Sequence, residues 1–175
     1  MIFSLSRAEQ ATAIKVAASR HIESVARDRR DSLYKKKYCQ SLAMHVLGCF
    51  GELAFCRLMG LRWDESVNRF GVGDLPNLEI KTRSSMSHDM YVRPEFDMGL
   101  ICVMMIGHDL PSVTFAGWVT AGEGRDRAYR VADLGGYGKP VHLVSRSMLN
   151  HPETLAQHFA MAGSDRPRHG RHHFD

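Results

Sequence analysis

The spacing of the apolar residues changes at Gly60, and this change limits the architectures that the chain can adopt. Before Gly60 the apolar residues recur at steps of three and four, which is typical of helices with one buried face. After Gly60 they alternate with polar residues or form short continuous runs, which is typical of strands. We therefore predict an α/β fold in which helices precede a sheet.

Two helices are predicted before Gly60. The first covers residues 6–27, with Ser6 as N-cap and Glu9 completing a capping box. Its expected buried stripe is Ala11, Ile14, Ala18, Ile22 and Val25. The second covers about residues 38–59, where Gly60 is expected to end the helix. Its expected stripe is Leu42, Val46, Phe50, Leu53 and Ala54.

Several strands are predicted after Gly60. Residues 61–70 and 77–83 are strand candidates, separated by the turn-forming segment GVGDLP. An extended segment around Tyr91 and Val92 follows, then the apolar run 100–107 and the segment 114–122. The continuous apolar character of 100–106 favours a central strand that is covered on both faces. Residues 123–150 are expected to be irregular apart from a short strand VHLVS, and a short helix is expected over 151–161.

The length of 175 residues is typical of one domain. We expect a single domain over residues 1–162, with residues 1–38 as a basic helical extension and 163–175 as a disordered tail. The chain lacks an uninterrupted apolar stretch long enough for a spanning helix, and its first ten residues do not read as an export signal. Cys39, Cys49, Cys56 and Cys102 show no metal-ligand spacing, so reduced core thiols and a cytoplasmic location without membrane contact are expected.

The net charge of +4 is concentrated near the N-terminus. Residues 1–38 hold nine Lys or Arg against four acidic residues, so the rest of the chain is close to neutral. A basic region of this kind suits a polyanion such as DNA, because each neutralised phosphate releases a counterion. A solvated helix face explains the same charges equally well. The candidate DNA contacts are Arg29, Arg30, Lys35, Lys36 and Lys37.

The segment GVGDLPNLEIKTR carries the candidate chemistry. Because residues two apart in a strand share a face, Glu79 and Lys81 should project together while Leu78 and Ile80 enter the core. Carboxylates such as Asp74 and Glu79 suit a hard cation such as Mg²⁺, and the lysine suits orientation of a nucleophile beside a phosphate. Taken alone, an E-x-K triplet is more often a solvated surface pair.

The order of these residues resembles the PD-(D/E)XK nuclease superfamily, the restriction-endonuclease-like nucleases that include small phage enzymes. The resemblance rests on D-x(4)-E-x-K after a helix that carries Gly51–Glu52. It implies a restriction-endonuclease-like αβββαβ core with a mixed central sheet, here after an N-terminal helical extension. It also implies Glu52, Asp74, Glu79 and Lys81 as catalytic residues, with Mg²⁺ held by Glu52, Asp74 and Glu79 and with Mn²⁺ able to substitute.

Two features of the motif differ from the family pattern. Gly73 stands where the motif name has proline. Asp74 and Glu79 lie five residues apart, so they can converge only if Gly73, Leu75 and Pro76 form a bend. Asp64 is the alternative carboxylate if no such bend exists. On the helix, Glu52 is expected just off the buried stripe, near solvent and within reach of the sheet edge.

We therefore expect a metal-dependent DNA endonuclease, with Arg83 and Ser84 as further phosphate contacts and a possible homodimer. A polar loop leaving the strand accounts equally well for Arg83 and Ser84. The alternatives are an exonuclease or junction-specific nuclease with the same centre, an enzyme acting on RNA or nucleotides, and a nucleic-acid-binding protein of the same fold that does not cut. Metal binding separates the last of these from the nucleases.

Overall fold

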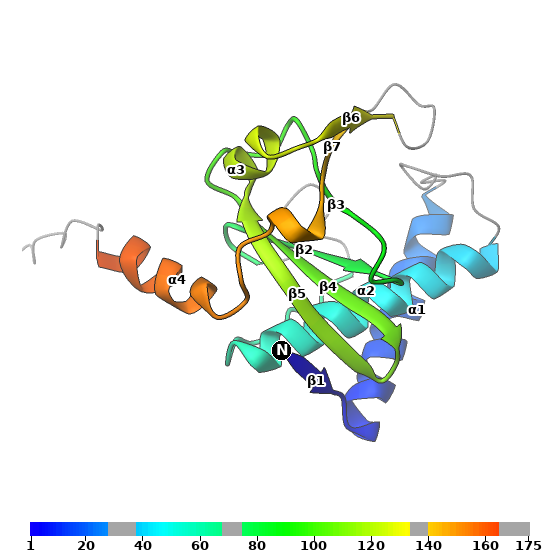
Figure 1. The fold of residues 1–175 in the computed structure, drawn as a ribbon. Coiled ribbons are helices and arrows are strands. Elements are labelled where there is room, and N and C mark those ends of the chain that lie inside the picture. Colours follow the sequence, from blue (N-terminus) through cyan, green and yellow to red (C-terminus); the bar gives the residue numbers. More distant parts are fainter. Residues whose placement is uncertain (28–37, 68–74, 134–139, 165–175) are drawn as a thin grey trace, which may run out of the picture.

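A computed structural model describes residues 1–27, 38–67, 75–133 and 140–164. Figure 1 shows helices and strands in a mixed arrangement, which confirms the predicted α/β class. The helices are α1 (Arg7–Ala26), α2 (Tyr38–Leu58), α3 (Ala121–Asp126) and α4 (Thr154–Ser164), with a 3-10 turn η1 (Arg146–Met148). The strands are β1 (Ile2–Ser4), β2 (Leu78–Arg83), β3 (Met90–Val92), β4 (Ile101–Asp109), β5 (Ser112–Thr120), β6 (Arg130–Ala132) and β7 (Val141–Val144).

The strands form two sheets. The larger sheet has the order β1-β5-β4-β2, in which β2 runs parallel to β4 and the other pairs are antiparallel. The smaller sheet is antiparallel, with the order β3-β7-β6. The larger sheet is therefore mixed, as expected, and among the described strands β2 lies at its edge. The described elements between α2 and α3 are four strands, so they do not establish an αβββαβ order.

Strand β4 separates two hydrophobic cores. Residues 101–107 are all buried, which confirms the prediction of a central strand covered on both faces. Val103 and Met105 belong to the core that contains α1 and α2. Cys102, Met104 and Ile106 belong to a second core, with Met90, Val92 and Val144 of the smaller sheet. Alternate residues of one strand thus serve different cores.

Both predicted ends of the helical region are present. At the start of α1, the Glu9 backbone N–H donates to Ser6 Oγ at 3.4 Å, and the Ser6 N–H donates to Glu9 Oε2 at 2.9 Å. At the end of α2, Gly60 adopts a φ of 65°, and the Leu61 N–H donates to the Cys56 carbonyl at 2.8 Å. The capping box and the glycine stop are therefore confirmed.

The predicted buried face of α1 is wrong. The buried residues are Ala13, Val16, Ala17 and His21. Ile14, Ile22 and Val25 are instead 49%, 62% and 50% exposed. Small side chains let α1 pack closely on α2, and α2 in turn packs on the sheet. The expected helical extension therefore contributes Ala13, Val16 and Ala17, and not its isoleucines, to the main core.

Some predicted elements differ from those observed. Residues 61–67 form no strand, and 68–70 lie outside the described residues. The region 123–150 is more regular than expected, since it includes the end of α3 and the strands β6 and β7, the latter at the predicted VHLVS. Helix α4 begins at Thr154, three residues later than expected. Residues 165–175 of the expected tail lie outside the described residues.

The stretch Gln40–Leu58 of α2 has the length and apolar composition of a membrane-spanning helix. Within it, Leu47 and residues 49–56 are buried inside the protein. A core helix has the same composition, so this property is weak evidence for a membrane location.

Candidate functional site

The two faces of β2 differ as the sequence predicts. Leu78 and Ile80 are buried in the core beneath α2. Glu79 and Lys81 project from the opposite face and form an ion pair, with side chains 15% and 16% exposed. The carboxylate and the ammonium are therefore held side by side on a strand, with limited access to water.

Two aromatic rings lie near the Lys81 ammonium. The Lys81 Nζ lies 5.2 Å from the centre of the Tyr91 ring and 5.9 Å from that of Phe96. Arg83, two residues further along the same face, places its guanidinium carbon 5.5 Å from the Tyr91 ring centre. These distances are within the range of cation–π attraction. Neither ring was predicted as part of the site, since their only signal was an extended segment near Tyr91.

The Arg83 side chain has unused hydrogen-bonding capacity. Its Nε is buried and has no hydrogen-bond partner within the part of the chain that the structure describes. Ser84 follows at the end of β2 and is exposed. The face of β2 thus presents one carboxylate and two cations, with a polar exit at Ser84.

A tight turn precedes β2. The Leu78 N–H donates to the Leu75 carbonyl at 3.0 Å, and the Leu75 N–H donates to the Leu78 carbonyl at 3.2 Å. Asn77 has a φ of 58°, and the Pro-Asn pair at the two central positions is typical of a type II turn. Leu75, which follows Asp74 in the chain, therefore pairs with Leu78, which precedes Glu79. Asp74 itself lies outside the described residues.

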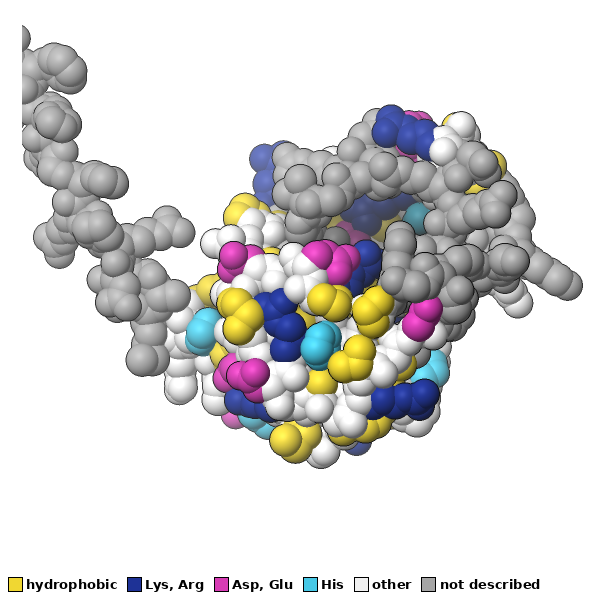
Figure 2. Space-filling view, turned by 90° about the horizontal axis from the view of Figure 1, so that it is seen from above, with side chains coloured by type: hydrophobic (Ala, Val, Ile, Leu, Met, Phe, Trp, Pro, Cys, Tyr) yellow, Lys and Arg dark blue, Asp and Glu magenta, His cyan; other side chains and the backbone are white. Residues whose placement is uncertain are grey.

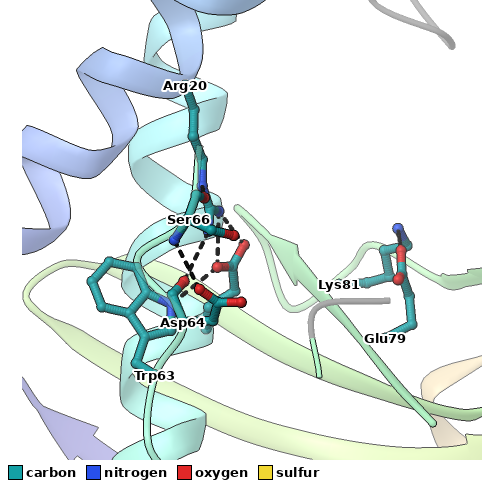
Figure 3. A network of polar contacts seen from close by, with 7 residues as sticks. Arg20, Trp63, Asp64, Ser66, Glu79 and Lys81 are labelled. Atoms are coloured by element: carbon teal, nitrogen blue, oxygen red, sulfur yellow. Dashed lines mark hydrogen bonds and ion pairs between the residues drawn. The ribbon is translucent and has the colours of Figure 1, made fainter. Parts of the chain in front are cut away.

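The Glu52 carboxylate is bound by other side chains. Arg20 Nη1 donates to both of its oxygens at 2.8 Å, and Trp63 Nε1 donates to Oε2 at 3.1 Å (Figure 3). Glu52 is only 8% exposed, so the expectation that it stays near solvent is wrong. It is buried because α1 supplies a counter-ion that no sequence spacing indicated.

Helix α2 covers one face of β2, and the ion pair lies on the other. A Cβ atom built on Gly51 would lie 1.9 Å from Thr82 Oγ1, so the helix touches the strand there. Thr82 alternates with Lys81, which places Lys81 on the opposite face. Figure 3 shows Glu79 and Lys81 apart from the cluster around Arg20. The described residues therefore do not bring Glu52 and Glu79 to one centre.

Asp64, the alternative carboxylate, lies in the Arg20 cluster. Arg20 donates to the backbone carbonyls of Asp64 and Ser66 at 3.3 and 3.1 Å. The Ser66 N–H donates to Asp64 Oδ1 at 3.0 Å. The Arg20 side chain thus binds the backbone at residues 64 and 66, which form no strand. Asp64 lies beside Arg20 and apart from Glu79 (Figure 3).

No group of three potential metal ligands of the His, Cys, Asp or Glu type occurs among the described residues. Of the three predicted metal carboxylates, Glu52 is neutralised by Arg20 and Glu79 is paired with Lys81. Asp74 is not described. The described residues alone therefore do not make a complete Mg²⁺ site.

The predicted DNA contacts are only partly described. Arg29, Arg30, Lys35, Lys36 and Lys37 lie outside the described residues. On the face drawn in Figure 2, Lys and Arg side chains alternate with acidic and apolar ones, so the described part of that face carries no block of one charge. Arg83 and Ser84 remain as described candidates for a phosphate.

Three of the four cysteine side chains are described. Cys49, Cys56 and Cys102 are buried, as predicted for core residues; the side chain of Cys39 is not described. Cys102 pairs with Glu79 in the register of β2 and β4. Burial and, to a smaller extent, the Glu79 carboxylate raise the pKa of Cys102 to about 12. A raised pKa of this kind disfavours the thiolate, which is the nucleophilic form of the side chain.

Comparisons of the chain with protein-family models, with curated proteins and with solved structures found no match. The functional assignment therefore depends on the residues themselves.

Proposed function

We propose that the protein is a metal-dependent DNA endonuclease of the PD-(D/E)XK type, centred on Asp74, Glu79 and Lys81. The observation that carries the proposal is the turn Leu75–Leu78, whose two ends are joined by backbone hydrogen bonds. The motif requires a bend between its two acidic residues, and this turn supplies one. Glu79 and Lys81 follow it on one face of β2.

The chain's own residues divide the work as follows. Glu79 supplies one metal-binding carboxylate and Asp74 the other. The bound Mg²⁺ or Mn²⁺ would polarise the phosphate and lower the pKa of its water. Lys81 holds a positive charge next to the reacting phosphate, and the neighbouring rings exclude water from it. Arg83 and Ser84 contact the phosphodiester backbone beyond the strand.

Glu52 has a different role in this proposal. Its charge is matched by Arg20, and both carboxylate oxygens accept hydrogen bonds. We therefore assign it to the stability of α1, α2 and residues 64–66 rather than to the metal. The contacts of Glu52 are also what favours the second candidate, a nucleic-acid-binding protein of the same fold that does not cut.

The proposal is tested by incubating supercoiled plasmid and end-labelled linear DNA with the protein in Mg²⁺, Mn²⁺ or EDTA. Wild type should nick the plasmid with either metal and not with EDTA. Asp74→Asn, Glu79→Gln and Lys81→Met should each lower the rate by about 100-fold, since each removes a group that acts on the reacting phosphate. Glu153→Gln, whose side chain is 75% exposed on another part of the surface, is the matched control and should cut normally.

Other outcomes separate the alternatives. Degradation of linear DNA from its ends without nicking of the plasmid indicates an exonuclease, whereas cleavage confined to four-way junctions indicates a junction enzyme. Activity on RNA alone identifies a ribonuclease. If wild type binds DNA but cleaves none of these substrates with either metal, the nuclease proposal is rejected and the binding protein becomes the better description.

A further inference from the structure

The outward face of α1 is unusually apolar for a surface helix. Ile14, Ile22 and Val25 are about half exposed or more, as given above. The structure describes every residue between Ala8 and Ala26. Among those that are exposed, Lys15 is the only charged one. A helix face of this composition and length favours contact with another protein surface.

The apolar residues on this face follow a symmetric spacing. Taking Ala18 as the centre, Ile14 and Ile22 lie four residues away on either side. Ala11 and Val25 lie seven residues away on either side. At 100° per residue all five fall within about 40° of the direction of Ala18. The stripe therefore reads almost the same in both chain directions.

Such a stripe is complementary to itself in an antiparallel arrangement. When two copies of a helix cross antiparallel on a two-fold axis, residues at equal distances on opposite sides of the axis meet. With the axis at Ala18, Ile14 of one copy meets Ile22 of the other, and Ala11 meets Val25. Alanine at the crossing point allows the two helices to approach closely. We propose that α1 forms a homodimer interface with a second copy of this chain, antiparallel about Ala18.

The opposite face of α1 is already occupied within the chain. Ala13, Val16 and Ala17 pack against the core, and Arg20 binds Glu52. The two faces of α1 therefore have separate uses, and the dimer needs no rearrangement of the fold. A single pair of helices buries less than the roughly 1,600 Å² of a standard interface, so the dissociation constant should be on the order of micromolar. The interface does not depend on the proposed nuclease activity.

Sedimentation velocity of the full chain tests the proposal. Protein concentrations between about 1 and about 100 μM span the expected micromolar dissociation constant. Wild type should shift from monomer to dimer. Ala18→Glu places two carboxylates together on the axis and should raise the dissociation constant at least tenfold, since opposed like charges are strongly unfavourable. Ser19→Glu adds the same charge one residue away, about 100° from the stripe, and should leave the dimer intact.

A charge-swap pair tests the antiparallel direction. Ile14→Lys with Ile22→Glu in one chain puts opposite charges together in the dimer, whereas Ile14→Glu with Ile22→Glu puts like charges together. The first double variant should dimerise and the second should not. Circular dichroism melts of all variants show whether each is folded. A wild type that stays monomeric at 100 μM, or an Ala18→Glu variant that dimerises as wild type does, overturns the proposal.

Discussion

Arg20 of α1 and Glu52 of α2 form a buried ion pair in which one guanidinium nitrogen lies 2.8 Å from both carboxylate oxygens. The Arg20 and Glu52 side chains are 21% and 11% exposed. The pair links both helices to residues 63–66, so several segments depend on one interaction.

Removing Arg20 should therefore be costly. Arg20→Met leaves the Glu52 charge buried without its partner, which we expect to lower the free energy of unfolding by roughly 3 kcal/mol. Adding Glu52→Gln removes that charge while leaving an amide oxygen for the Trp63 N–H, and should recover part of the loss. Urea denaturation measures both. Arg27→Met is the control: it breaks the exposed Arg27–Glu23 pair and should cost less than about 1 kcal/mol. Equal losses for Arg20→Met and Arg27→Met would contradict this account of Glu52.

Gly51 and Gly48 of α2 should respond oppositely to alanine. A Cβ on Gly51 would lie 1.9 Å from Thr82 Oγ1 and 2.8 Å from its Cγ2, so Gly51→Ala should destabilise the protein by roughly 1–3 kcal/mol. Nothing lies within 4 Å of the corresponding position on Gly48, so Gly48→Ala should stabilise the helix by about 0.5–1 kcal/mol. Thermal melts distinguish the two. Stabilisation by Gly51→Ala would mean that α2 does not rest on β2 at this point.

Helix α3 should weaken in acid. Burial raises the pKa of Glu123, but the Thr120 backbone N–H, the Arg127 charge and the Thr120 hydroxyl outweigh it and lower that pKa below its usual 4.5. Because the folded pKa is the lower one, the stabilisation is present at neutral pH and is lost as the pH falls through it. The test is to measure melting temperatures between about pH 7 and about pH 3. Below about pH 4.5 the melting temperature of Glu123→Gln should fall less steeply than that of wild type. Thr120→Ala removes the N-cap and should cost about 1 kcal/mol at pH 7. An unchanged acid profile in Glu123→Gln would exclude this source of acid sensitivity.

Tyr91 should matter through its ring and not its hydroxyl. The ring lies near both Lys81 and Arg83, so Tyr91→Leu should free Lys81 from its position and slow DNA cleavage by about tenfold, as expected for loss of one positioning contact. Tyr91→Phe keeps the ring and should cut like wild type. Single-turnover rates with Mg²⁺ provide the comparison. If Tyr91→Phe loses as much as Tyr91→Leu, the hydroxyl rather than the ring is responsible.

Local sequence signals predicted those elements that depend on neighbours in the chain. The capping box at Ser6, the stop at Gly60 and the buried strand β4 were all predicted correctly. Helix α3 was missed although Thr120 and Glu123 form the same kind of capping box, because six residues are too few for a helical period to stand out. The alternation of Glu79 and Lys81 with Leu78 and Ile80 was also predicted, since it follows from strand geometry alone.

The errors concern interactions between distant segments. The buried face of α1 was assigned to its largest apolar residues, but the buried residues are Ala13, Val16, Ala17 and His21. Residues 61–67 were expected in a strand, but Arg20, more than 40 residues earlier, binds the carbonyls at 64 and 66. Glu52 was expected near solvent, but it is buried and bound by the same arginine. Spacing in the sequence contains no information on such partners.

The alternation along β4 has a consequence for how the molecule melts. Val103 and Met105 serve one core, and Cys102, Met104 and Ile106 serve the other. If either core opened, β4 would lose the packing on one face and its side chains on the other face could no longer be held in register. Neither core can then persist alone, and heat or denaturant should unfold both in one cooperative transition.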